Sequence, residues 1–586
     1  MLATLYSLGT LATIVLAVYG IGRPLLRWLR VGDDGVLAAT VWSIGLGFVV
    51  AGWLLSMAVL AGLPLSVLVG VITLAGSLWG LGEAACAYLV LRNPLKIEIA
   101  AIDDLAGRMQ PKPPGRLLHT ILRFGIAMTL LATLVMALAP PTSRAAMRNS
   151  LELPKIVVLG GSLSDSCAST PQFGGMIYAW ALLLDGPVAA TLLAWFFGLL
   201  LAASTALVAR AVVGREWAWC AGAFALMAPG VAYQMSAPLD DLMMAAFATL
   251  ALAAWWRGTV ELLSPRWLIL AGLFLGAALA TKVVAVALLV AAAITWSVEA
   301  ARRDEHRHEV AIGAARCLLI ALIVASPWWT WVVARGRELA TVDGGPSAIV
   351  QLGPWFLAIV PGLLVARRLR GLHLLVWVAV VYLLASGLIV PRSRAFAPLV
   401  PLLATIATWV CMELSRLPVM ARRIAATSLA VTAASLVAAN LLPARDCWRV
   451  ACGLESRPAY LRSRVGAYAA AEVANRLMRG DSQVLSQDDC GLYFESRVVS
   501  NVDLLDGKSF DATGMLRSLR DQKFTHLLLC SSQGDQETTA TDALLRQAVA
   551  VELAKPEPEA MLPLTEYRFT DFAGRRSHYQ LLMFRR

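Results

Sequence analysis

The sequence predicts an all-α, polytopic membrane bundle followed by a small α/β domain. Hydrophobic residues make up 58% of the 586-residue chain and charged residues only 15%, a composition that excludes an ordinary soluble protein. Apolar runs long enough to cross a bilayer, roughly 20 residues each, recur from the amino terminus to about residue 443. Beyond residue 444 the sequence becomes polar, and strand and helix patterns alternate.

The apolar runs predict about fourteen membrane-spanning helices of roughly 20 residues each. The separations at Gly62 and Lys282 are the shortest, so the helix pairs beside them are the least distinct. The expected spans are 2–22, 36–61, 63–91, 118–139, 187–209, 216–234, 239–256, 267–282, 284–300, 313–334, 350–366, 372–390, 397–415 and 423–443.

Basic residues are concentrated in alternate loops, which predicts the orientation of the chain. Loops rich in Lys and Arg stay on the cytoplasmic side, so the loop over 140–187 and the region after residue 444 are expected on the outer face. We expect a bacterial inner-membrane protein with a periplasmic carboxyl-terminal domain. The net charge of +11 reflects this topology. The chain has no aromatic and basic module that reads bases, so we expect no nucleic-acid partner.

Three parts are expected along the chain. Residues 1–117 form a three-span extension with a cytoplasmic linker, 118–443 form the membrane core, and 444–586 form an extracytoplasmic α/β domain. In the last part, strands are expected at Gln483–Ser486, Arg497–Val502, Thr525–Cys530 and Tyr579–Phe584, and helices at Tyr468–Met478 and Met515–Gln522. Cys447 and Cys452 lie in a compartment that permits disulfides, and the sequence leaves their pairing open.

Two adjacent carboxylates, Asp240 and Asp241, lie at the expected outer end of the span over 239–256. Ionisable residues near apolar spans are costly and mark function. Two neighbouring negative charges raise each other's pKa unless a cation is present. One reading is that one Asp caps the helix while the other is solvated. The other reading is that the pair binds an acceptor or a divalent cation. No other metal site or cofactor is indicated.

Three basic residues lie on the expected outer side, against the charge bias of the loops. Lys282 interrupts two apolar runs, and it either extends to the interface or holds a lipid phosphate. Arg392 and Arg394 flank Ser393 in one short loop, and guanidinium groups match phosphate oxygens bidentately. The alternative is that both arginines anchor the loop to lipid headgroups.

Over about 118–470 the sequence resembles the GT-C superfamily, multispanning glycosyltransferases that use polyprenyl-phosphate-linked sugars and include protein mannosyltransferases and aminoarabinose transferases. The motifs that carry the resemblance are Leu151-Glu152-Leu153-Pro154-Lys155, Met176-Ile177-Tyr178, Ala237-Pro238-Leu239-Asp240-Asp241, Thr281-Lys282, Arg394 with Pro398-Leu399-Val400-Pro401, and Gly453-Leu454-Glu455-Ser456-Arg457 with Tyr460.

The resemblance implies a GT-C-like bundle with a large first outer loop and a site that the donor lipid enters from the bilayer. An acid of that loop would act on the acceptor, and basic groups would hold the leaving phosphate. By position, Lys282 and Arg394 match the basic sites, and Asp240 or Asp241 matches a second acidic site. The sequence departs from the family where an Asp of the first loop is expected, because this position is Ala145.

Three explanations of Ala145 remain open. Glu152 or Asp165 of the same loop substitutes for the missing acid; the Asp240/Asp241 pair acts alone; or the chain keeps the fold without the chemistry. The expected function is therefore sugar transfer from a polyprenyl-phosphate donor to a lipid, glycan or protein acceptor, among membrane lipids. The alternative is a catalytically inactive scaffold or assembly subunit that binds protein partners through the domain over 444–586.

Overall fold

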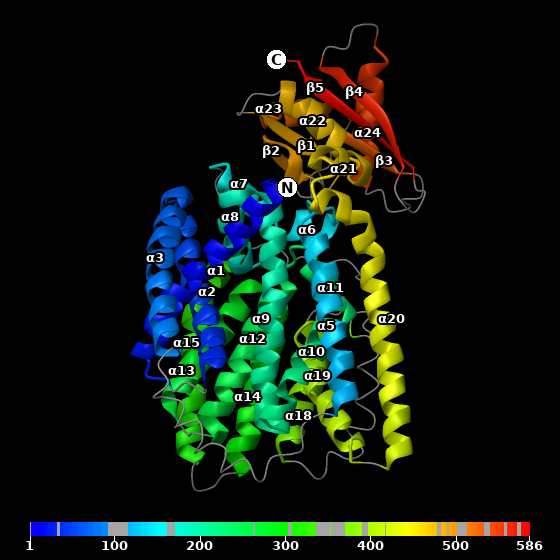
Figure 1. Cartoon of the computed structure of the whole chain (residues 1–586). Helices are drawn as coiled ribbons and strands as arrows, with labels where there is room; N and C mark the ends of the chain where they lie inside the picture. Colours follow the sequence, from blue (N-terminus) through cyan, green and yellow to red (C-terminus); the bar gives the residue numbers. More distant parts are fainter. Residues whose placement is uncertain are drawn as a thin grey trace. The chain divides into compact units, whose positions relative to one another are not determined.

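The computed structural model forms two compact units (Figure 1). One comprises Met1–Ala139 with Ser169–Ala451, and the other comprises Pro140–Ala168 with Cys452–Arg586. The beginning of the expected outer loop is thus grouped with the carboxyl-terminal residues, which the sequence did not predict. The structure describes all residues except 1, 32–34, 92–114, 161–169, 262–263, 303–306, 336–351, 353–369, 390–395, 417, 478–481, 489–490, 501–511, 533–539, 556–559, 571–575 and 586.

Among the described residues of the first unit, seven helices are long and apolar enough to cross a membrane, and five shorter helices are apolar. The chain is therefore a multi-pass membrane protein. The count of about fourteen spans stays a prediction, and the span expected at 350–366 lies almost entirely outside the described residues.

The described residues of the first unit form helices and no strands (Figure 1). Their bounds are α1 Leu2–Trp28, α2 Val36–Leu60, α3 Leu65–Leu91, α5 Arg116–Ala137, α8 Phe173–Asp185, α9 Pro187–Val213, α10 Arg215–Met227, α11 Pro229–Met235, α12 Asp241–Trp256, the π-helix η4 Arg257–Glu261, α13 Pro265–Thr281, the 3₁₀ helix η5 Val283–Ala285, α14 Val286–Arg302, α15 Arg307–Arg335, α18 Arg370–Ile389, α19 Leu399–Leu414 and α20 Val419–Ala451.

Helix α1 packs against both α2 and α3 through glycines. A Cβ atom at Gly20 of α1 would lie 2.0 Å from the carbonyl oxygen of Gly76 in α3. A Cβ atom at Gly47 of α2 would lie 1.8 Å from the carbonyl oxygen of Val18. Lipid provides no hydrophobic force between helices, so small residues that allow close backbone contact stabilise such packing.

Helix α12 lies at the centre of the first unit. Every residue from Asp241 to Leu250 is buried, because apolar side chains surround the helix and pack against α9 and α13. The ring of Phe247 lies edge-on to Phe173 of α8 at 6.0 Å and to Phe197 of α9 at 5.8 Å. The amino-terminal end of α12, where the Asp pair lies, is therefore held by the core.

Within its described residues, the second unit contains one mixed, five-stranded sheet in the order β2-β1-β3-β5-β4. Strand β1 is parallel to β2 and β3, whereas β5 is antiparallel to β3 and β4. The strands are β1 Gln483–Ser486, β2 Arg497–Ser500, β3 His526–Ser532, β4 Met561–Thr570 and β5 Arg576–Phe584. The helices are α6 Arg144–Asn149, α7 Glu152–Val158, α21 Arg457–Arg464, α22 Tyr468–Leu477, α23 Ala512–Asp521 and α24 Ala540–Leu553.

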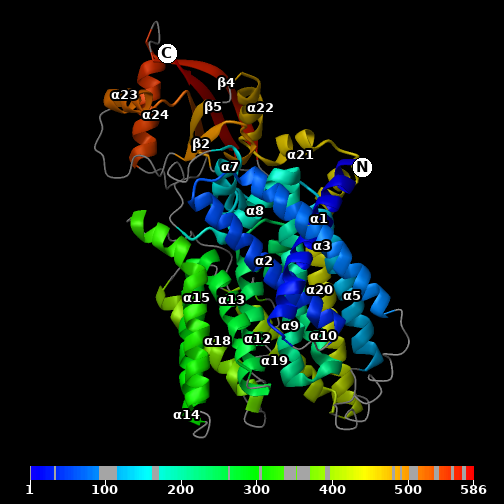
Figure 2. The ribbon, with the colours of Figure 1, turned by 90° about the vertical axis from the view of Figure 1, so that its left-hand side faces the viewer.

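Helices α23 and α24 lie on one side of this sheet and α22 on the other (Figure 2). Leu519 of α23 and Leu545 of α24 are fully buried with Leu485, Leu527 and Leu582 of the strands in one core cluster. On the α22 side, the hydroxyl of Tyr567 accepts a hydrogen bond from the backbone nitrogen of Ala470 at 3.0 Å. The second unit therefore has its own hydrophobic core.

All four expected strands and both expected helices of this unit are present, with ends shifted by a few residues. Strand β4 and helices α21 and α24 were not predicted. Strand β4 is an edge strand with little burial, and Pro563 lies at its register shift. The more buried positions alternate on both sides of this shift but change phase there, so one continuous alternation does not run through the strand.

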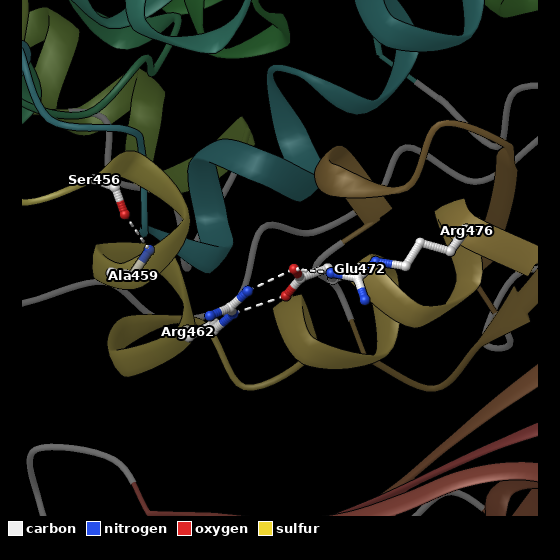
Figure 3. Close-up of polar contacts among 5 residues, drawn as sticks. All are labelled: Ser456, Ala459, Arg462, Glu472 and Arg476. Carbon is white, nitrogen blue, oxygen red and sulfur yellow. Dashed lines mark hydrogen bonds and ion pairs between the residues drawn. The ribbon is translucent and has the colours of Figure 1, made fainter.

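Polar contacts connect α21 to α22 (Figure 3). The Ser456 side chain accepts a hydrogen bond from the backbone nitrogen of Ala459 at 3.3 Å and caps α21. Glu472 accepts from Arg462 Nε at 2.7 Å and from Arg476 at 2.8 Å. These hydrogen bonds, with Arg462 contributing most, lower the pKa of Glu472.

The disulfide that the sequence left open is not formed. Cys452 has a free thiol. Cys447 is held within α20, and Cys452 lies beyond the last residue of that helix.

Candidate functional site

Both carboxylates of the Asp pair are buried. Asp240 is 5% exposed and Asp241 3% exposed. Asp240 occupies the N-cap position of α12, but its side chain makes no capping hydrogen bond. The reading in which one Asp caps the helix and the other is solvated is therefore wrong. Burial of two acidic groups at a helix amino terminus is costly without a nearby positive charge.

Lys282 provides this positive charge. Its ammonium nitrogen lies 2.5 Å from Oδ1 of Asp241, and its side chain remains 24% exposed. Lys282 follows the last residue of α13 with an extended backbone, φ −151° and ψ 144°, before the 3₁₀ helix η5 begins. The break between the two apolar runs thus positions Lys282 beside the start of α12. Lys282 therefore pairs with a carboxylate, which neither reading from the sequence included.

Helix α8 forms one wall beside the pair. A Cβ atom at Gly174 would lie 3.1 Å from Oδ1 of Asp240 and 3.1 Å from Cγ2 of Thr281. One turn later, the buried hydroxyl of Tyr178 donates a hydrogen bond to the carbonyl oxygen of Leu239 at 2.9 Å. Gly174 allows the close approach and Tyr178 fixes the turn before α12. The motif Met176-Ile177-Tyr178 was the sequence signal for this contact, although it suggested no role.

Helix α18 contributes a buried tyrosine to the same region. Tyr382 is 1% exposed, and the carboxylate of Asp241 acts on it electrostatically. Sequence reasoning did not select Tyr382, because it lies within an apolar run where a tyrosine is unremarkable. The candidate site of the first unit thus draws residues from α8, α12, α13 and α18.

An apolar pocket with a volume of about 70 Å³ lies along the same helices. It begins at Ala248 of α12, which the helical rise places about 10 Å from Asp241 along the axis. Leu275, Leu288, Val378 and Leu402 contribute walls from α13, α14, α18 and α19. Its lining is suited to a hydrocarbon chain rather than to a polar ligand.

The other residues that the sequence suggested for the site lie in the second unit or outside the described residues. Glu152 begins α7 in the second unit, where it lines a pocket with Arg148, Lys155 and Asp488. Ala145 lies in α6, which supplies no carboxylate. Asp165, Arg392 and Arg394 lie outside the described residues. Within the described ranges, no group of three or more His, Cys, Asp or Glu side chains gathers that could hold a metal ion.

Lys155 connects α7 to the region between β1 and β2. Its ammonium donates hydrogen bonds to the carbonyl oxygens of Gly491 at 2.6 Å and Ser496 at 3.2 Å. The side chain is partly exposed along its length, but its charged end is buried. Burial lowers the pKa of Lys155 from 10.5 to about 7, and the negative charge of Glu152 partly opposes this shift.

This lowered pKa predicts that stability depends on pH. Between the folded pKa of about 7 and the ordinary value of 10.5, the unfolded chain holds the Lys155 proton and the folded chain releases it. The free energy of unfolding should therefore rise with pH across this window, by up to about 1.4 kcal/mol per pH unit. Thermal unfolding of wild type and Lys155→Met at pH 7 to 10 measures the difference.

The exposed Lys523 provides the matched control. Lys523→Met should leave the pH dependence of wild type unchanged, whereas Lys155→Met should remove its rising component. Identical pH profiles for wild type and Lys155→Met would show that Lys155 is charged throughout this range.

Comparison with known proteins identifies the fold of the chain. No protein-family model matches it, and no curated protein matches it. The crystal structure of ArnT from Cupriavidus metallidurans bound to undecaprenyl phosphate is similar with a TM-score of 0.52 at 15% identity, over 78% of this chain and 97% of ArnT. The apo structure of ArnT gives a TM-score of 0.50 over the same shares. An Archaeoglobus fulgidus oligosaccharyltransferase structure gives a TM-score of 0.41 at 11% identity, over 69% of each chain.

The likeness to ArnT shows that this chain has the GT-C fold that the sequence resemblance implied. At 15% identity the likeness concerns the fold alone.

Proposed function

We propose that this protein transfers a sugar from a polyprenyl-phosphate donor to an acceptor. The observation that carries the proposal is the ion pair between Lys282 and the buried Asp241 beside Asp240, at the start of the buried helix α12, which also borders an apolar pocket. A lipid-linked phosphate needs a positive charge for its headgroup and an apolar path for its chain, and this region offers both. The ArnT structure was determined with undecaprenyl phosphate bound, on the same fold.

The residues suggest a division of roles. Lys282, still partly exposed, provides an ammonium for the leaving phosphate, and Asp241 positions that ammonium. A carboxylate, Asp240 or an acid of the first loop such as Glu152 or Asp165, accepts the proton of the acceptor nucleophile. The nucleophile forms a bond to the anomeric carbon while the bond from that carbon to the phosphate oxygen breaks, which releases polyprenyl phosphate.

Further groups complete this proposal. Arg392 and Arg394 are additional candidates for the donor phosphate, and a divalent cation, if the reaction uses one, would bind at Asp240 and Asp241. We place the reaction on the outer face of a bacterial inner membrane, with the carboxyl-terminal domain in the periplasm. The acceptor is a lipid, a glycan or a protein.

Binding of undecaprenyl phosphate to the purified full-length chain tests the proposal. We expect native mass spectrometry to detect the lipid on wild type and on Arg416→Ala, which alters only an exposed ion pair with Glu413. Lys282→Ala should bind at least roughly tenfold more weakly, because a charged contact of 1.5–3 kcal/mol is lost. Absence of binding to wild type would contradict the proposal.

One observation favours a second candidate, an inactive scaffold with the same fold. Position 145 carries no acid, and Lys282 is already paired with Asp241. The scaffold predicts that Lys282→Ala and Asp240→Asn leave the cellular function of the protein intact. Transfer predicts that both variants abolish it while the protein remains in the membrane.

A further inference from the structure

Helices α13 and α15 lie side by side in close backbone contact (Figure 2). A Cβ atom at Gly272 of α13 would lie 2.6 Å from the carbonyl oxygen of Cys317 in α15. One turn later, a Cβ atom at Gly276 would lie 2.7 Å from the carbonyl oxygen of Ala321. Both contacts advance along the two helices together, so the helices run in the same direction with no room for a side chain at either glycine.

The same interface ends in a hydrogen bond from the side chain of Trp329. Its indole N–H donates to the carbonyl oxygen of Leu279 in α13 at 3.1 Å. Leu279 comes three residues after Gly276, a spacing that places both on one face of the helix. Trp329 belongs to α15 and is partly buried. The two helices are therefore joined by this bond near their carboxyl ends.

The carbonyl group that accepts this bond belongs to the last turn of α13. The final hydrogen bond of the helix runs from the backbone nitrogen of Lys282 to the carbonyl oxygen of Ala278 at 3.3 Å. The last four carbonyl groups of an α-helix have no partner within the helix. Leu279 carries the first of these four, so it needs a donor from elsewhere. Trp329 supplies that donor from a neighbouring helix and thereby caps α13.

This cap lies directly before Lys282, where α13 gives way to η5. The backbone of Lys282 is extended, and its carbonyl oxygen accepts a hydrogen bond from the backbone nitrogen of Ala285 at 3.1 Å. Its ammonium lies 2.5 Å from Oδ1 of Asp241. A lysine has a flexible four-carbon stem, so its ammonium keeps one place only if the backbone that carries it is fixed. Trp329 fixes this backbone, and Asp241 holds the ammonium.

We propose that Trp329 is a positioning residue that fixes the end of α13 and so holds Lys282 where its ammonium meets the donor phosphate. The role toward the phosphate rests on the proposed transfer reaction. Trp329 contacts the carbonyl group of Leu279 and acts on the donor through Lys282. A displacement of about 1 Å at a site can lower a rate roughly a hundredfold even when the altered residue is remote.

Two variants of neighbouring tryptophans form a matched pair. Trp329→Phe keeps an aromatic ring and removes the N–H that caps α13. Trp328→Phe is the control, because its indole N–H donates to Oγ of Ser56 in α2 at 2.9 Å. Each variant loses one hydrogen bond between helices, and Trp328 is the more buried of the two. Trp328→Phe should therefore lower the thermal transition temperature at least as much as Trp329→Phe, without affecting Lys282.

The position of Lys282 can be measured without any lipid. The full-length chain in phospholipid nanodiscs is acetylated with an N-hydroxysuccinimide ester, and peptide mass spectrometry gives the rate at Lys282. The side chain is 24% exposed in the ion pair with Asp241. Trp329→Phe should raise the rate roughly fivefold, the factor that corresponds to one neutral hydrogen bond. Trp328→Phe should react like wild type. Equal rates in wild type and Trp329→Phe would overturn the proposal.

Binding of undecaprenyl phosphate, followed by native mass spectrometry, tests the role toward the phosphate. Trp329→Phe should bind the lipid at least roughly fivefold more weakly than wild type, and Trp328→Phe should bind like wild type. In the Lys282→Ala background, Trp329→Phe should have no further effect, because its influence passes through the lysine. An additional loss in the double variant would show that Trp329 acts elsewhere and would contradict the proposal.

A second pair of variants keeps the test valid if Trp329→Phe fails to fold. Trp329→His retains a ring N–H that can replace the indole N–H, whereas Trp329→Leu has a similar size and no donor. The histidine variant should keep the acetylation rate of Lys282 and the lipid affinity close to wild type, and the leucine variant should change both. Identical behaviour of the two variants would show that the N–H has no role.

The two proposals fail separately. If wild type binds no undecaprenyl phosphate, the transfer proposal is wrong, and the acetylation rates still decide whether Trp329 positions Lys282. If wild type and Trp329→Phe bind the lipid equally well, transfer stands and the role of Trp329 toward the phosphate is wrong.

Discussion

Alanine in place of Lys282 should lower the free energy of unfolding by about 3 kcal/mol. The change leaves Asp241, which is 3% exposed, without the ammonium that lies 2.5 Å from its carboxylate. Removing one partner of a buried ion pair is far more costly than removing both, because the remaining charge stays desolvated. Equilibrium unfolding in mixed micelles, followed by tryptophan fluorescence, measures the loss.

A double-mutant cycle separates this effect from lost packing. Lys282→Ala combined with Asp241→Ala should recover much of the stability that Lys282→Ala loses. Arg416→Ala is the matched control, because its ion pair with Glu413 is exposed and should contribute less than about 1 kcal/mol. Additive losses in the double variant would show that Asp241 does not depend on Lys282.

Alanine in place of Gly20 should destabilise the packing of the first three helices by about 1–3 kcal/mol. The added Cβ atom would lie 2.0 Å from the carbonyl oxygen of Gly76 and 2.5 Å from the backbone nitrogen of Gly80. These are backbone atoms of α3, so relief requires the two helices to separate. Thermal unfolding in a single detergent should show a lower transition temperature.

Gly9 is the control for this prediction, since it lies in the same helix. A Cβ atom there meets nothing within 4 Å. Gly9→Ala should be neutral or slightly stabilising, because alanine favours helix by about 1 kcal/mol over glycine. Equal stability of the Gly20→Ala and Gly9→Ala variants would show that α1 and α3 do not pack as closely as described.

Much of the α/β domain could be predicted because strand and helix periodicities are local properties. Strands β1 and β3 are short apolar runs, and their pattern alone identifies them. The sequence did not predict strand β4, because an edge strand with Pro563 at a register shift has no continuous alternation of apolar and polar residues. The sequence likewise offered no reason to group the helices of 140–158 with the sheet, since this depends on contacts between distant segments.

The charged residues of the candidate site could also be predicted from the sequence, but the contacts between them could not. Sequence reasoning selected Asp240, Asp241 and Lys282, because charges beside apolar runs are rare and costly. It could not show that Lys282 pairs with Asp241, 41 residues earlier in the chain. A hairpin of two helices with 16 and 17 residues brings the start of α12 beside the end of α13, so the segment lengths were a usable signal.

The sequence by itself determined that this protein is a membrane-embedded bundle with a separate α/β domain, because hydropathy and periodicity are fixed by neighbouring residues. Only the tertiary structure decided which charges meet. It paired Lys282 with Asp241 and placed Asp488 at one pocket with side chains from α6 and α7. Burial and electrostatic pairing depend on distances between segments that are remote in the chain, and such distances exist only once the helices have packed.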